Sequence, residues 1–145
     1  MEKLLAIDPG ETVGYAWFSL DELGEEVLDV EADQCHCGEF IDKLEDWLIK
    51  EDYFHCLIEN YIIRQDTMAA NIGKELKTAK LLGVIEYLLD KYEIAYYYQP
   101  AGQGKAFFDR ERLEGMGLWV VGKNHARDAI RHGLWFVTFG DGINV

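Results

Sequence analysis

Three acidic residues stand beside apolar segments, where a carboxylate is costly unless it is paired or binds a cation. Asp8 and Glu59 each follow directly after a short apolar run, and Asp128 lies between alanine residues in an apolar segment. Two Mg²⁺ or Mn²⁺ ions held about 4 Å apart by such carboxylates can activate a water molecule and stabilise the leaving oxygen of a phosphodiester. Mg²⁺ suits this role because it keeps waters and substrate oxygens among its ligands. The three acids therefore indicate metal-dependent phosphodiester chemistry.

Each acid taken alone has a simpler interpretation. Asp8 precedes Pro9 and Gly10, a combination typical of a turn. Glu59 could pair with Arg64, and Asp128 with a base on its own helix. The three together are a stronger indication than any one of them, because a mixed sheet would bring them to a common edge.

His125 lies three residues before Asp128, so on a helix both side chains can face one site. There His125 could bind a metal ion, or orient and deprotonate an attacking water. The alternative is a histidine on the helix surface or at the helix N-terminus. His132 lies further along the same segment and is interpreted as structural.

The elements that must position these residues follow from the hydrophobic pattern. Strands are predicted at 4–7, 13–20, 25–32, 55–59 and 94–98, and helices at 39–50, 68–92 and 123–138. Gln99 and Pro100 are expected to stop the last strand, and 102–114 is either a helix or a mobile loop. The order β-β-β-α-β-α-β-α predicts a single α/β domain over 1–145: a mixed five-stranded sheet with helices on both faces. Carboxylates at strand ends would converge on one edge of it.

The net charge of −13 is unevenly distributed. Residues 1–60 carry 17 acidic and 3 basic side chains, whereas 61–145 carry 10 and 11. A phosphate backbone would therefore favour the later part of the chain. The alternative is that these bases are ordinary solvated side chains.

Three cysteines, at 35, 37 and 56, do not suggest a disulfide framework, because their number is odd and no leader peptide is expected. The segment Cys35-His36-Cys37 raises the alternative of a zinc site, with His55 and Cys56 as the second ligand pair. Reduced thiols near a strand end are the favoured interpretation.

Three motifs resemble those of the RuvC family of four-way (Holliday) junction resolvases, which belongs to the RNase H-like superfamily. Residues 7–16 (IDPGETVGYA) resemble its first motif, 57–61 (LIENY) its second and 124–129 (NHARDA) its third. Their order and the chain length are similar to a phage-type or mobile-element version with little added. The family typically carries two aspartates in the third motif. Here His125 takes the earlier position, as in the RuvC-like domains of CRISPR effector nucleases.

The resemblance implies a metal-dependent crossover junction endodeoxyribonuclease that resolves branched DNA by phosphodiester hydrolysis. Asp8, Glu59, His125 and Asp128 would be its catalytic residues and metal ligands, with two Mg²⁺ (or Mn²⁺) ions per site. A homodimer is expected, without a nucleotide cofactor. The residues expected to contact DNA are Thr12, Arg64, Lys74, Lys77, Lys80, Lys105, Lys123 and Arg127.

Two other functions remain open within this fold. One is a nuclease for flaps, RNA–DNA hybrids or single strands, and the other is a non-catalytic DNA-binding homologue. A kinase-like ATPase is disfavoured because the chain is too short for two lobes. No apolar run approaches the ~18–20 residues needed to cross a bilayer. We therefore expect a cytoplasmic protein without membrane contact, in the host cytoplasm if phage-encoded.

Overall fold

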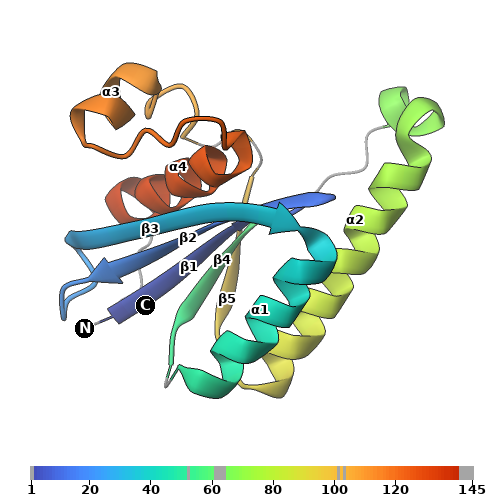
Figure 1. Cartoon of the computed structure of the whole chain (residues 1–145), viewed down its shortest axis with the longest axis horizontal. Helices are drawn as coiled ribbons and strands as arrows, with labels where there is room; N and C mark the ends of the chain where they lie inside the picture. The colour runs from blue at the N-terminus through green and yellow to red at the C-terminus, as the bar shows by residue number, and fades with distance from the viewer. Residues whose placement is uncertain (1, 52, 61–64, 101, 103, 141–145) are drawn as a thin grey trace.

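One mixed sheet forms the centre of the molecule (Figure 1). The computed structural model describes residues 2–51, 53–60, 65–100, 102 and 104–140, and for 65–76 the backbone alone. The strands are β1 (Glu2–Asp8), β2 (Thr12–Leu20), β3 (Val27–His36), β4 (His55–Asn60) and β5 (Tyr96–Pro100). The helices are α1 (Cys37–Lys50), α2 (Gln65–Lys91), α3 (Arg110–Gly115) and α4 (Asn124–Phe139). The strand order is β3-β2-β1-β4-β5, so the predicted mixed five-stranded α/β fold is confirmed.

The direction of the strands decides where the acids lie. β1 pairs antiparallel with β2 and parallel with β4, and β4 pairs parallel with β5. Ile7 of β1 lies opposite Ile58 of β4, so the next residue of each strand, Asp8 and Glu59, emerges at the same edge of the sheet. Parallel neighbours with apolar interiors thereby bring two carboxylates together.

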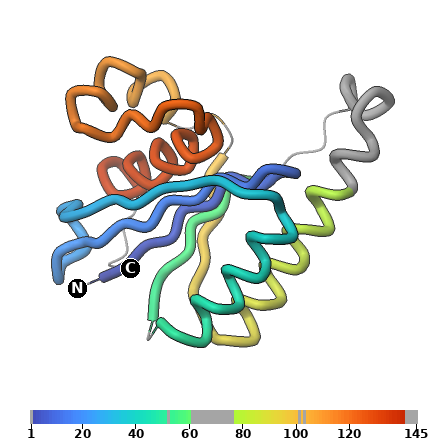
Figure 2. Tube along the Cα trace, in the orientation of Figure 1, coloured from blue at the N-terminus to red at the C-terminus, as the bar shows by residue number. Residues whose placement is uncertain are grey.

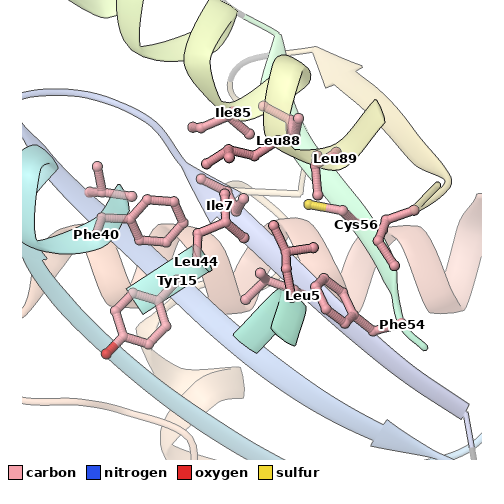
Figure 3. Packing of buried hydrophobic residues seen from close by; sticks show 14 of the residues in the cluster. Leu5, Ile7, Tyr15, Phe40, Leu44, Phe54, Cys56, Ile85, Leu88 and Leu89 are labelled. Carbon is pink, nitrogen blue, oxygen red and sulfur yellow. The ribbon is translucent and has the colours of Figure 1, made fainter. Parts of the chain in front are cut away.

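Helices cover both faces of the sheet (Figure 2). α1 and α2 pack on one face and α4 on the other, because alternate residues of β1 point to opposite sides. Figure 3 shows the first of these cores, in which Leu5 and Ile7 of β1 meet Phe40 and Leu44 of α1 and Ile85 and Leu88 of α2. Leu4 and Ala6 of β1 pack with α4 instead. No described helix is long and apolar enough to cross a membrane.

The strands differ from the prediction at their ends, most clearly in β3, which also runs on to His36 instead of ending at 32, and in β5. β3 begins at Val27 rather than at 25, because the Asp21 carboxylate accepts the backbone N–H groups of Glu25 and Glu26 and holds them in a turn. β5 continues through Gln99 and Pro100, which were expected to stop it. Proline is tolerated there because β5 is an edge strand, where a missing N–H need not break the ladder.

The segment after β5, for which sequence left a helix or a mobile loop open, contains turns and then the short helix α3. Asp109 caps α3, since its carboxylate accepts the backbone N–H of Arg112 at 2.9 Å. The cysteines are free thiols, and Cys56 is fully buried in the core. His36 caps α1 by accepting the backbone N–H of Gly38 at Nδ1, a role that the zinc alternative did not anticipate.

Replacing Gly133 by alanine is expected to lower the free energy of unfolding by about 1–3 kcal/mol, because overpacking a filled core forces its neighbours to shift. A Cβ at Gly133 would lie 2.1 Å from the ring of the fully buried Phe18. Gly83 of α2 is the matched control, because nothing lies within 4 Å of its Cβ position. Alanine there should raise the free energy of unfolding by up to about 1 kcal/mol. Urea denaturation measures both variants, and equal effects would contradict the packing of α4 on β2.

Candidate active site

Asp8 and Glu59 share a hydrogen bond at the ends of β1 and β4. The pKa of Asp8 is raised to about 9, chiefly by burial and then by the hydrogen bond to Glu59 and the charges of Glu59 and Asp128. Burial also acts to raise the pKa of Glu59, but the neighbouring His132 and the hydrogen bond from Asp8 outweigh it and lower that pKa. The pair therefore holds one proton at neutral pH, with Asp8 as the donor and Glu59 as the acceptor.

His125 reaches this pair from the first turn of α4. Its Nδ1 lies 3.1 Å from Oδ2 of Asp8, and 37% of its side chain is exposed against 10% for Asp8. The ring thus has one nitrogen on a buried carboxyl group and an edge open to solvent. This placement fits a residue that contacts both the acids and a substrate.

Two residues of the neighbouring strands β2 and β3 fix the start of α4. A Cβ at Gly14 of β2 would lie 2.0 Å from the carbonyl oxygen of His125, so only glycine allows this approach. Gln34 of β3 accepts the backbone N–H groups of His125 and Ala126 at 2.9 and 3.2 Å. Lys123, the N-cap residue, makes no side-chain cap of its own. Gln34 therefore satisfies helix donors that would otherwise lack a partner.

Asp128 lies one turn further along α4, between two bases. Its Oδ1 is 3.1 Å from Nη1 of Arg131, and its Oδ2 is 3.6 Å from Nζ of Lys105. The positive charge of Lys105 also acts to lower the pKa of Asp8 and of Glu59. Lys105, predicted only as a DNA contact, is thus electrostatically coupled to all three acids.

The other predicted DNA contacts have different surroundings. Thr12 and Lys77 line, with His125, a cavity of about 610 Å³ beside the acids, and Lys80 is exposed on α2. Lys123 pairs with Asp33 at 2.8 Å. Arg127 stacks on Trp119 and donates to the carbonyl of Val120, so its guanidinium is occupied within the chain. Arg64 and the side chain of Lys74 lie outside the described residues.

Sequence reasoning missed two polar residues at the site, Gln34 and Gln99. Gln99 lies opposite Glu59 in the β4–β5 pair and is buried, as is His132 of α4. The position of His132 at the site could have been predicted from spacing, because it follows Asp128 by four residues and therefore shares its helix face. Nothing in the sequence indicated that Gln34 would cap a helix 91 residues away.

The donor set has the chemistry that Mg²⁺ or Mn²⁺ requires, namely carboxylate oxygens on a histidine-flanked edge. Asp8 and Glu59 share a proton in a position where a cation would otherwise balance their charge. Within the described part of the chain, no three or more His, Cys, Asp or Glu side chains converge closely enough to hold an ion. Asp128, bound to Arg131 and Lys105, would have to turn toward Asp8 to complete such a group.

With a chelator present, the free energy of unfolding is expected to fall as the pH rises from 3.8, the ordinary pKa of aspartate, to about 9, the pKa of folded Asp8. Between these values the folded chain retains a proton that the unfolded chain has released, so stability decreases with pH. The lowered pKa of Glu59 has the opposite effect only in acid, where its contribution is lost as the pH falls below 4.5.

Asp8→Asn should flatten this decrease and raise the free energy of unfolding in mildly alkaline buffer by more than about 1 kcal/mol. The variant has no carboxyl group whose pKa rises on folding, and each tenfold change in an ionisation constant corresponds to about 1.4 kcal/mol. Urea titrations at a series of pH values measure the slope. Asp29 is an exposed carboxylate on β3, so Asp29→Asn should keep the wild-type slope. A wild-type slope in Asp8→Asn would contradict the shared proton.

No protein-family model matches this chain, and no curated protein matches its sequence. Two solved structures are similar over almost their whole length. RuvC of T. thermophilus in complex with a Holliday junction substrate is 18% identical, with 92% of each chain covered and a TM-score of 0.60. The Fowlpox virus resolvase in complex with Holliday junction DNA is 11% identical, covering 93% of this chain and 96% of the resolvase, also with a TM-score of 0.60. This chain therefore has the RNase H-like fold of these two resolvases.

Proposed function

We propose that the chain is a metal-dependent, structure-selective endodeoxyribonuclease that resolves four-way DNA junctions by phosphodiester hydrolysis. The observation that carries the proposal is the placement of Asp8, Glu59, His125 and Asp128 at one edge of an RNase H-like sheet. These residues also form the three motifs that resemble those of the RuvC family. The junction-bound resolvases with this fold support branched DNA as the substrate class.

In this proposal Asp8, Glu59 and Asp128 hold Mg²⁺ or Mn²⁺, with two ions per site and His125 as a further ligand or as the base. The ions would supply a nucleophilic water and stabilise charge on the leaving oxygen. His125, hydrogen-bonded to Asp8 through Nδ1, would take the proton of the attacking water or complete the ligand set. Lys105 would turn its ammonium from Asp128 to a non-bridging phosphate oxygen, which frees that carboxylate.

The DNA would approach where the acids are neutralised and the bases are free. Lys77 and Lys80 project from α2, and Thr12 lies on the same side of His125 as Lys77. The proposed homodimer would place two such sites about a two-fold axis, which suits a junction where two strands are cut in register. Apart from Asp8 and Glu59, most acidic residues of 1–60 would lie away from the phosphate backbone.

The experiment that tests the proposal is cleavage of a labelled four-way junction and of linear duplex of the same sequence, in Mg²⁺, Mn²⁺ or chelator. Wild type and Asp29→Asn should cut the junction symmetrically with either metal, whereas Asp8→Asn should lose at least about 10²-fold in rate, as expected when a group that stabilises the transition state is removed. Flaps, RNA–DNA hybrids and single strands complete the substrate panel.

Equal cutting of linear duplex and junction would contradict structure selectivity and favour a general nuclease. Tight junction binding without cutting in any metal would favour the non-catalytic homologue. Cutting by Asp8→Asn at the wild-type rate would remove Asp8 from the site.

Metal binding is expected to stabilise the folded chain, because a ligand that binds only the folded state adds RT ln(1 + [L]/Kd). An ion at a hundred times its Kd should add about 2.7 kcal/mol, which a thermal melt detects as a rise in Tm. The rise should be lost in Asp8→Asn and Glu59→Gln and kept in Asp29→Asn. An equal rise in all four proteins would place the metal elsewhere.

A further inference from the structure

His132 is a fully buried polar side chain on α4 that the proposed function does not use. It lies among the apolar residues that fix α4 to the sheet, and its Nε2 makes no hydrogen bond within the described chain. That nitrogen faces the site, because it lies 3.6 Å from Oε2 of Glu59. A buried donor without a partner costs about 1–3 kcal/mol, so an apolar residue would fill this position at lower cost.

Gln99 determines which nitrogen of His132 carries the hydrogen. Its side-chain nitrogen lies 2.9 Å from Nδ1 of His132 and 3.2 Å from the His132 carbonyl oxygen. A carbonyl oxygen can only accept, so the amide group must present its NH₂ to both atoms. Nδ1 therefore accepts a hydrogen bond, and the hydrogen of the neutral ring is on Nε2.

The Nε2–H group is consequently directed at the Glu59 carboxylate. Gln99 can hold it there because Gln99 and Glu59 are opposite residues of β5 and β4. Both Gln99 and His132 are buried, so water does not compete for these contacts. The separation of 3.6 Å is slightly longer than a hydrogen bond, and a small rotation of the carboxylate would close it.

We infer that Gln99 and His132 are positioning residues for Glu59: they hold its carboxylate in the orientation in which it binds the catalytic metal ion. The inference rests on the proposed function, since it assigns Glu59 as a ligand. Groups that orient metal ligands commonly change metal affinity by 10- to 100-fold when they are removed. A residue that merely filled the core would change stability and leave metal affinity unchanged.

The test compares two replacements of His132 in the full chain. His132→Gln keeps an N–H donor near the position of Nε2, whereas His132→Leu keeps an apolar volume without a donor. The Mn²⁺ dissociation constant, measured by electron paramagnetic resonance, should rise roughly 10- to 100-fold in His132→Leu and in Gln99→Leu. It should stay within roughly threefold of wild type in His132→Gln, well below that 10-fold effect. Asp29→Asn is the control and should bind as wild type does.

A second readout needs neither metal nor DNA. The ¹⁵N shifts of the His132 ring in the metal-free protein should report hydrogen on Nε2, and Gln99→Leu should reduce that preference. Hydrogen on Nδ1 in the wild type would overturn the inference, as would wild-type Mn²⁺ affinity in both leucine variants. If His132→Leu does not fold, Gln99→Leu decides alone.

The outcomes separate this inference from the proposed function. If wild type binds Mn²⁺ with the expected ranking of variants but cuts no junction, the positioning role stands and the nuclease proposal fails. If wild type cuts junctions and both leucine variants bind Mn²⁺ as tightly as wild type, the nuclease proposal stands and the positioning role fails. Absence of Mn²⁺ binding in the wild type would overturn both.

Discussion

Two carboxyl groups meet at the end of a parallel strand pair, and the rest of the site compensates for the charge that they would carry. Because β1 and β4 run parallel with apolar interiors, neither Asp8 nor Glu59 can move away without breaking the sheet. Like charges at short range in a buried position are unfavourable, so one proton remains on the pair. His125, Lys105 and His132 approach from different turns and segments of the chain and face these acids.

Several basic side chains make contacts within the chain, so the count of bases does not measure the positive charge available to a phosphate backbone. The later part of the chain is nearly neutral by count, but several of its bases are bound within it. The guanidinium carbons of Arg110, Arg127 and Arg131 lie 4.8, 4.2 and 6.0 Å from the centre of the Trp119 ring. Arg127 and Arg131 join Trp119 to α4, and Arg110 joins it to α3. Counting bases therefore overstates the positive surface, whereas lysines such as Lys77 and Lys80 are exposed.

The parts of the structure that sequence could predict are those set by periodicity. Apolar runs ending in Asp8 and Glu59 indicated strand ends, and the apolar face around Asp128 indicated a helix packed on the sheet. The residues that sequence missed act through contacts between distant segments. Gln34 of β3 caps α4. Lys105 was expected only to contact DNA, and its contact with Asp128 was missed because it comes from a segment without a clear hydrophobic period. Gln99 was expected to end the strand because Pro100 follows it. A proline argues against a strand unless the strand is known to lie at the edge of the sheet.

The capping of α4 by Gln34, with the close approach of Gly14 to His125, has a consequence for the order of folding. The two contacts join β3 and β2 to a helix that is synthesised 91 residues after Gln34 and 111 residues (125 − 14) after Gly14. Contacts of such long sequence separation form late, since closing the intervening loop costs entropy. A nascent chain that ends before α4 contains Asp8 and Glu59, yet it lacks His125, Asp128 and the helix that orders them. The assembled edge therefore exists only once the last helix has docked.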